Sequence, residues 1–157
     1  MELIQQKPKY IIDASSMISQ KSDEQYRRLV YKNLWEHIEN LINSHVVVTC
    51  SEIVCELKDV EITDWFNGLD FLVLPICDEV QANVKKVVTS YPKLINFREL
   101  KSSGDAFLIA TAIKYDLIVI TEENPKRENR IPYVCRCLGV KCTNILGLCE
   151  NENWDFM

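Results

Sequence analysis

The segment Tyr10-Ile11-Ile12-Asp13-Ala14-Ser15-Ser16 decides the fold class of this chain of 157 residues. Its bulky apolar residues predict a short buried strand, and the small or polar residues that follow predict the end of that strand. Asp13 therefore stands at the carboxyl end of a buried strand. Ligands bind beyond the carboxyl ends of the strands in an open parallel sheet, so this position is a candidate for function.

Apolar strands and amphipathic helices alternate through the rest of the sequence. Further strands are predicted at 46–49, 71–75 and 117–120, and 140–142 precedes a last helix from 143. Three more helices are predicted at 23–43, 51–58 and 63–69. Three others are predicted to begin at residue 78, at residue 102 or 103, and in the turn that contains Pro132. Residues 121–130 are predicted to form a loop. Parallel strands need crossover helices. The pattern predicts one domain, 1–157, built as a three-layer α/β/α sandwich around a mostly parallel sheet of four or five strands.

Several local features of the helices are also predicted. Ser51 and Asp78 have the side chains of N-cap residues, because their oxygens can accept hydrogen bonds from free helix N–H groups. Ile113 is expected to face inward, together with its apolar neighbours on the same helix. The segment after Pro92 is rich in charge and is interpreted as a connection.

The composition is that of an ordinary globular protein, with 47% hydrophobic residues, 4 glycines and 5 prolines. No apolar run approaches the ~20 residues that cross a bilayer. The start of the chain lacks the apolar stretch of a signal peptide, so we expect a cytoplasmic protein that does not enter a membrane. A formal net charge of −5 argues against binding of nucleic acid through bulk positive charge.

Seven cysteines, an odd number, are spread through apolar segments and are interpreted as reduced, buried thiols. The spacing of Cys135, Cys137 and Cys142 differs from the paired CxxC of zinc ribbons, which argues against a zinc site. Trp35 and Trp65 stand beside apolar residues on helix-like segments, which favours packing over stacking on bases.

Four separated acids are predicted to meet at one edge of the sheet. Asp13 and Glu123 follow the ends of strands, Asp105 stands in the first turn of its helix, and Glu56 lies on the helix after the second strand. Two neighbours are alternatives: Glu122 for Glu123, which is preferred by its spacing from Thr121, and Glu52 for Glu56. Taken singly, each acid is better explained as a helix cap or a solvated residue, and only the set as a whole favours a functional site.

Carboxylates that converge repel one another, and a divalent cation removes that conflict. Oxygen ligands without histidine suit Mg²⁺ or Mn²⁺ better than zinc. Such ions can activate a water molecule and stabilise the oxygens of a phosphate under attack. The four acids therefore predict a metal site for hydrolysis of phosphodiester bonds.

The motifs IIDASSMI (11–18), SEIVCELK (51–58), SGDAFLIATA (103–112) and VITEE (119–123), in this order, resemble those of the PIN-domain nucleases, including the VapC-like toxins. The resemblance spans nearly the whole chain, and the tail IPYVCRCLGVKC is similar to a less studied PIN branch. It implies a PIN-like fold with Asp13, Glu56, Asp105 and Glu123 as metal ligands and catalytic residues. It also implies supporting roles for Ser15 and Thr121. Most of the family has Asp at the fourth position, where this chain has glutamate.

Basic residues flank two of the acids and could contact RNA phosphates, although a solvated loop explains them equally well. They are Arg98 and Lys101 before the third acid, and Lys126, Arg127, Arg130 and Arg136 after the fourth.

The resulting hypothesis is a metal-dependent endoribonuclease, as in the toxin of a toxin–antitoxin pair, with RNA as substrate. An antitoxin protein covering the acids and a homodimer are expectations that come from the family resemblance. The alternative is a PIN-fold binding or assembly module that no longer cuts. A phospho-acceptor receiver domain is disfavoured, because it requires an acidic pair near the first strand and a late lysine.

Overall fold

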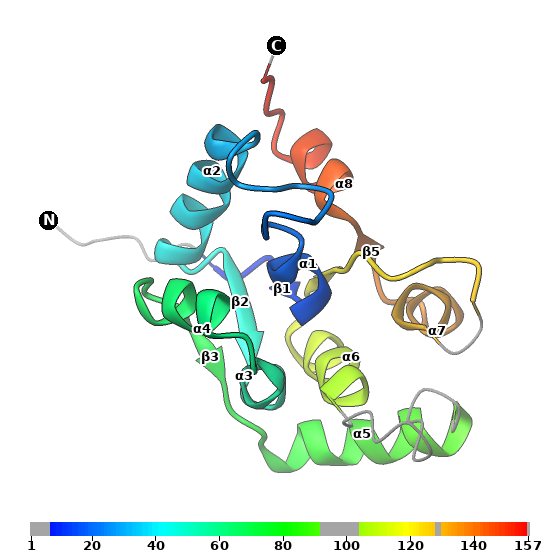
Figure 1. The fold of residues 1–157 in the computed structure, drawn as a ribbon. Helices are drawn as coiled ribbons and strands as arrows, with labels where there is room; N and C mark the ends of the chain where they lie inside the picture. The colour runs from blue at the N-terminus through cyan, green and yellow to red at the C-terminus, as the bar shows by residue number, and fades with distance from the viewer. Residues whose placement is uncertain (1–6, 92–103, 128–129, 157) are drawn as a thin grey trace, which may run out of the picture.

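The computed structural model describes residues 7–91, 104–127 and 130–156 and consists of a five-stranded parallel sheet flanked by helices (Figure 1). The strands are β1 (Tyr10–Ile12), β2 (Val47–Cys50), β3 (Val73–Leu74), β4 (Ile118–Ile120) and β5 (Cys142–Thr143). The helices are α1 (Ala14–Ile18), α2 (Lys32–Asn43), α3 (Ser51–Glu56), α4 (Val60–Asn67), α5 (Asp78–Ser90), α6 (Gly104–Tyr115), α7 (Ile131–Leu138) and α8 (Ile145–Asn151). The predicted α/β fold class is confirmed.

The strand order β3-β2-β1-β4-β5 places β1 at the centre of the sheet. Ile11 pairs with Val48 on one side and with Val119 on the other, and all pairings are parallel. Strands β1, β2 and the last two residues of β4 are fully buried, which explains their continuous apolar sequences. The chain progresses outward from β1 to β3 and then crosses back to β4, so strand order reverses beside β1.

Helices cover both faces of the sheet, with α2 and α8 above it and α5 and α6 below it in Figure 1. Trp35 of α2 is buried and meets the ring of Trp65 of α4 at 6.0 Å, so both tryptophans pack in or against the core, as predicted. His37 of α2 meets Trp154, which follows α8, at 5.2 Å. In the described ranges, no helix is long and apolar enough to span a membrane.

The helix predicted at 23–43 is wrong in its first half, because α2 begins at Lys32. Residues 23–31 form turns in which Leu29 is 92% exposed. The backbone carbonyl of Tyr26 accepts a 2.7 Å hydrogen bond from Trp35 Nε1, and its backbone N–H donates to the carbonyl of Ser19. These contacts hold the segment in a conformation other than the helix that its apolar spacing predicts.

The predicted caps also need correction. Ser51 and Asp78 are the first residues of α3 and α5, and cysteines precede them at the N-cap positions. The third predicted helix begins earlier, at Val60, because Asp59 accepts a 3.1 Å hydrogen bond from the N–H of Ile62. The last helix begins at Ile145 instead of residue 143. Residues 102 and 103, and the charged segment after Pro92, lie outside the described residues.

Two predictions of burial fail. Ile113 is 40% exposed, because it lies on the outward side of α6. All seven cysteines are free thiols, but Cys55 and Cys137 are exposed instead of buried.

Candidate active site

A pocket of about 620 Å³ lies beyond the carboxyl ends of β1, β2 and β4. Parallel strands end at the same edge of a sheet, so residues distant in sequence meet there. The acidic residues that line this pocket are Asp13, Glu52, Glu56, Asp105 and Glu123. The structure therefore brings the four predicted acids together, with the alternative Glu52 beside them. We call this cavity the acidic pocket.

Asp13 follows β1 directly and is only 3% exposed. Its Oδ2 accepts a 2.7 Å hydrogen bond from the hydroxyl of Ser15 and a 2.8 Å hydrogen bond from the hydroxyl of Thr121. Burial raises the pKa of Asp13 above its ordinary value, and the two hydroxyl donors oppose that rise. The carboxylate is thus held in one orientation at the floor of the acidic pocket.

Glu56, the last residue of α3, faces the first residue of α6. The backbone N–H of Gly104 hydrogen-bonds to its carboxylate. A Cβ atom at Gly104 would come within 2.0 Å of Glu56 Oε1, so this approach requires glycine. Burial and, after it, the charges of Asp13 and Glu123 together raise the pKa of Glu56 to about 7, and the Gly104 hydrogen bond opposes this rise. Sequence reasoning missed Gly104, although the glycine before the acid in SGDAFLIATA was the signal available.

The two adjacent glutamates after β4 have different surroundings. Glu123 lines the acidic pocket, and its Oε1 accepts a 3.3 Å hydrogen bond from the N–H of Ile131 at the start of α7. Glu122 is not among the lining residues, and its Oε1 accepts a 2.8 Å hydrogen bond from the N–H of Ile145 at the start of α8. Tertiary contacts with two different helices separate these neighbours.

Asp105 lies in the first turn of α6, where free N–H groups favour a carboxylate. Arg130 also lines the pocket, together with Lys58 and Cys55, which the sequence did not single out. Lys126 and Arg127 are exposed in the loop after β4 and do not line it. Arg98 and Lys101 lie outside the described residues.

The donor chemistry of the acidic pocket fits a hard divalent cation, because its acids supply oxygen ligands whose mutual repulsion a cation would relieve. The pKa of Glu56 is raised mainly by burial, and the charges of Asp13 and Glu123 contribute to the rise. Within the described ranges, however, no three carboxylate, histidine or cysteine side chains are already grouped as a metal-binding cluster. Binding of a metal ion would therefore require side chains to move inward.

The parallel sheet with order 3-2-1-4-5 and acids at its carboxyl edge define a PIN-like α/β protein. The chain belongs to the family described as "Domain of unknown function (DUF4411)", whose model matches residues 10–156. A comparison with curated proteins finds no match.

Two solved structures have a similar fold. One is PAE2754 from Pyrobaculum aerophilum, with 12% sequence identity and a TM-score of 0.55, over 96% of this chain and 100% of that one. The other is FitAcB from Neisseria gonorrhoeae, with 16% identity and a TM-score of 0.50, over 87% of this chain and 98% of that one. At these identities the similarity establishes the fold, and the sequence-based prediction of a PIN-like fold is confirmed.

Proposed function

We propose that this protein is a metal-dependent endoribonuclease that hydrolyses RNA phosphodiester bonds in the acidic pocket. One observation carries the proposal: acids from four separate parts of the chain line a single pocket of about 620 Å³. Helix caps and solvated acids have no reason to converge in this way at the carboxyl edge of a sheet.

In this proposal, Asp13, Glu56, Asp105 and Glu123 hold Mg²⁺ or Mn²⁺. The bound ion would activate a water molecule and stabilise negative charge at the phosphate. Ser15 and Thr121 position Asp13 through their hydrogen bonds to its Oδ2. Glu56, with a pKa of about 7, is partly protonated near neutral pH, so protons and metal compete for it.

Binding of RNA must depend on local positive charge, because the net charge of the chain is −5. Lys58 and Arg130 line the acidic pocket and can contact RNA phosphates on either side of the cut. Lys126 and Arg127 extend the basic surface along the exposed loop. From the resemblance to toxins of this fold, we also propose a protein partner that covers the acidic pocket, and a homodimer.

The test is a titration of Mg²⁺ and Mn²⁺ into wild type, Asp13→Asn and Asp64→Asn, with single-stranded and structured RNAs. Asp64 is an exposed acid on α4, so its variant controls for the loss of one charge. We expect wild type and Asp64→Asn to cut RNA and to gain thermal stability with metal, and Asp13→Asn to do neither. Cleavage that survives in Asp13→Asn would contradict the proposal.

A second candidate function is a PIN-fold binding module that does not cut. Two observations favour it. The described residues contain no preformed metal-binding group. Glu123 also stands where most of the resembling nucleases have the shorter aspartate, and its Oε1 already accepts a hydrogen bond from the N–H of Ile131. RNA binding by wild type without cleavage and without metal stabilisation would support this candidate.

A further inference from the structure

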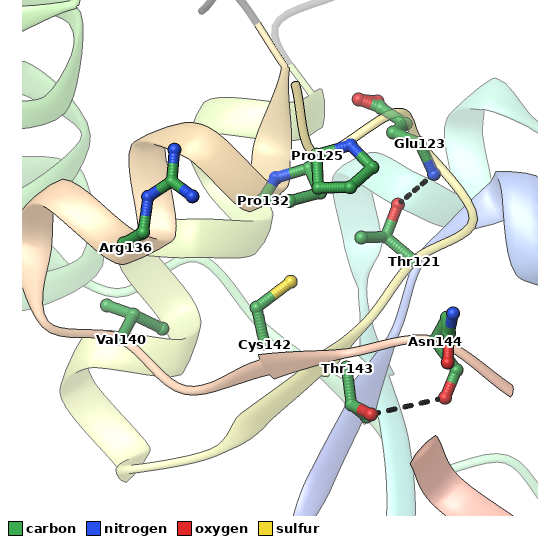
Figure 2. A pocket seen from close by; sticks show the side chains of 9 residues that line it. All are labelled: Thr121, Glu123, Pro125, Pro132, Arg136, Val140, Cys142, Thr143 and Asn144. Carbon is green, nitrogen blue, oxygen red and sulfur yellow. Dashed lines mark hydrogen bonds between the residues drawn. The ribbon is translucent and has the colours of Figure 1, made fainter. Parts of the chain in front are cut away.

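A second cavity, of about 490 Å³, adjoins the acidic pocket between the loop after β4, helix α7 and strand β5 (Figure 2). We call it the proline pocket. Its lining residues are Thr121, Glu123, Pro125, Pro132, Arg136, Val140, Cys142, Thr143 and Asn144. Glu123 lines both cavities, and Thr121 hydrogen-bonds to Asp13 of the acidic pocket. The two cavities therefore form neighbouring parts of one surface.

The walls of the proline pocket combine flat apolar faces with unused donors. Pro125, Pro132 and Val140 provide the apolar faces. Arg136 is exposed, lies 5.5 Å from the ring of Tyr133, and forms no ion pair with any described carboxylate. Asn144 uses its Oδ1 to cap α8 at the N–H of Gly147, while its amide nitrogen has no hydrogen-bond partner in the described part of the chain.

The charged and apolar groups of the proline pocket follow one another in a definite order. Glu123 lies at one end and Arg136 at the other, with the two prolines between them (Figure 2). A nucleotide strand can match this arrangement, because one sugar links two successive phosphates and carries a base that projects beside them. The two prolines offer apolar surface against which a base can be buried, and a guanidinium binds phosphate through charge-assisted hydrogen bonds.

We propose that the proline pocket is a substrate subsite that receives the nucleotide next to the scissile phosphate, with its base on Pro125 and Pro132 and the following phosphate on Arg136. This inference rests on the proposed nuclease function, because the acidic pocket must hold the scissile phosphate. The volume of about 490 Å³ lies within the range of small-ligand pockets, which suits one nucleoside.

Two cysteines allow the occupancy of each cavity to be measured separately. Cys55 lines the acidic pocket and Cys142 lines the proline pocket, whereas Cys77 lines neither. A hydrogen bond from Cys135 lowers the pKa of Cys142, and Lys114 lowers that of Cys77, which favours the thiolate form that an alkylating reagent attacks. Cys55 is exposed and is open to the same reagent.

The first experiment measures alkylation of each cysteine by iodoacetamide, with peptide mass spectrometry, in wild type with short unstructured RNA oligomers and Ca²⁺, which also takes oxygen ligands. Ca²⁺ replaces Mg²⁺ to suppress cleavage, so that the RNA is not consumed. We expect RNA to slow the reaction of Cys55 and Cys142 and to leave Cys77 unchanged. Protection of Cys55 without protection of Cys142 would overturn the subsite while leaving the nuclease proposal intact.

The second experiment compares Arg136→Ala with Lys32→Ala, which removes an exposed cation from the start of α2. Arg136→Ala should weaken RNA binding roughly fivefold to tenfold and reduce the slope of log Kd against log salt by about 0.7, as for one lost phosphate contact. It should also abolish protection of Cys142 at RNA concentrations that still protect Cys55. Unchanged RNA affinity in Arg136→Ala overturns the inference and assigns Arg136 to an acidic protein partner or to solvent.

The outcomes for the two proposals are distinguishable. If wild type neither cuts RNA nor shows protection of Cys55, the nuclease function fails and the subsite fails with it. If wild type cuts RNA but Arg136→Ala retains full affinity and protection of Cys142, only the subsite fails.

Discussion

Thr121 donates a 2.8 Å hydrogen bond to Oδ2 of Asp13, although 108 positions separate the two residues. The bond joins the ends of the neighbouring parallel strands β1 and β4. It is made inside the protein, where an unpaired carboxylate is costly, so the hydroxyl both stabilises Asp13 and fixes its direction.

Thr121→Val should separate this positioning effect from a general loss of stability. The replacement keeps the shape of the side chain but removes the donor to Asp13, so we expect about 1 kcal/mol lower stability. Cleavage should fall roughly tenfold to a hundredfold, as for loss of a group that orients a metal ligand. Urea unfolding and RNA cleavage measure the two effects.

The matched control is Thr111→Val, which changes another buried threonine, one whose hydroxyl bonds to the carbonyl of Phe107. It should lose stability without losing cleavage beyond twofold or so. Equal losses of cleavage in both variants would show that Thr121 has no special role.

The protein without metal should become less stable as pH rises from about 4.5 to about 7. The pKa of Glu56 is raised from 4.5 to about 7 in the folded state. In this window the folded protein keeps a proton that the unfolded chain has released, so raising the pH favours unfolding. Thermal melts in a chelator across this range measure the effect.

Glu56→Gln removes that titration, so its stability should depend less on pH in the same window, where the raised pKa values of Asp13 and Glu122 still contribute. Added Mg²⁺ should reverse the trend in wild type, because the ion binds the ionised carboxyl and stabilises more at pH 8 than at pH 5.5. A wild-type curve as flat as that of Glu56→Gln would refute the raised pKa.

Gly104→Ala should damage the acidic pocket while sparing the fold. The new Cβ would lie 2.0 Å from Glu56 Oε1 and must displace the end of that flexible side chain. Alanine is also a better helix former than glycine, by about 1 kcal/mol, which offsets part of the disturbance. We expect a roughly hundredfold loss of cleavage, typical of a misplaced catalytic group, with little change in melting temperature.

Gly68→Ala is the control for this substitution, because its Cβ would meet no atom closer than Trp65 O at 3.5 Å. Its cleavage rate should equal that of wild type. Full activity in Gly104→Ala would mean that the position of Glu56 does not matter for cutting.

Replacement of Glu122 should lower mainly stability, and replacement of Glu123 should lower mainly cleavage. Glu122→Ala removes the acceptor for the N–H of Ile145 at the start of α8, and the loss of such a cap costs about 1 kcal/mol. Glu123→Ala removes an acid from the acidic pocket and should abolish cleavage with a smaller effect on stability. Melting curves and cleavage assays on both variants test this; loss of cleavage only in Glu122→Ala would reverse the assignment.

Much of the fold could be predicted from sequence because its signals are local. The apolar run at Tyr10–Ile12 and the one at Ile118–Ile120 have the continuous pattern of buried strands, and the crossover requirement then makes them parallel. Asp13 stands directly after the first run and Glu123 stands three positions after the second, so their meeting at one edge follows from topology. The segment 23–31 shows the limit of this reasoning, since its apolar spacing matched a helix that tertiary hydrogen bonds replace.

The sequence by itself determined the alternation of strands and helices, the parallel sheet and the set of acids at its carboxyl edge, because each depends on residue type and short-range spacing. Only the tertiary structure decided which of Glu122 and Glu123 enters the acidic pocket, that a Cβ at residue 104 would displace the Glu56 carboxylate, and that Arg136 and two prolines form a cavity beside the acids. Those features depend on atoms from distant segments coming within a few ångströms of one another, and no local pattern encodes such distances.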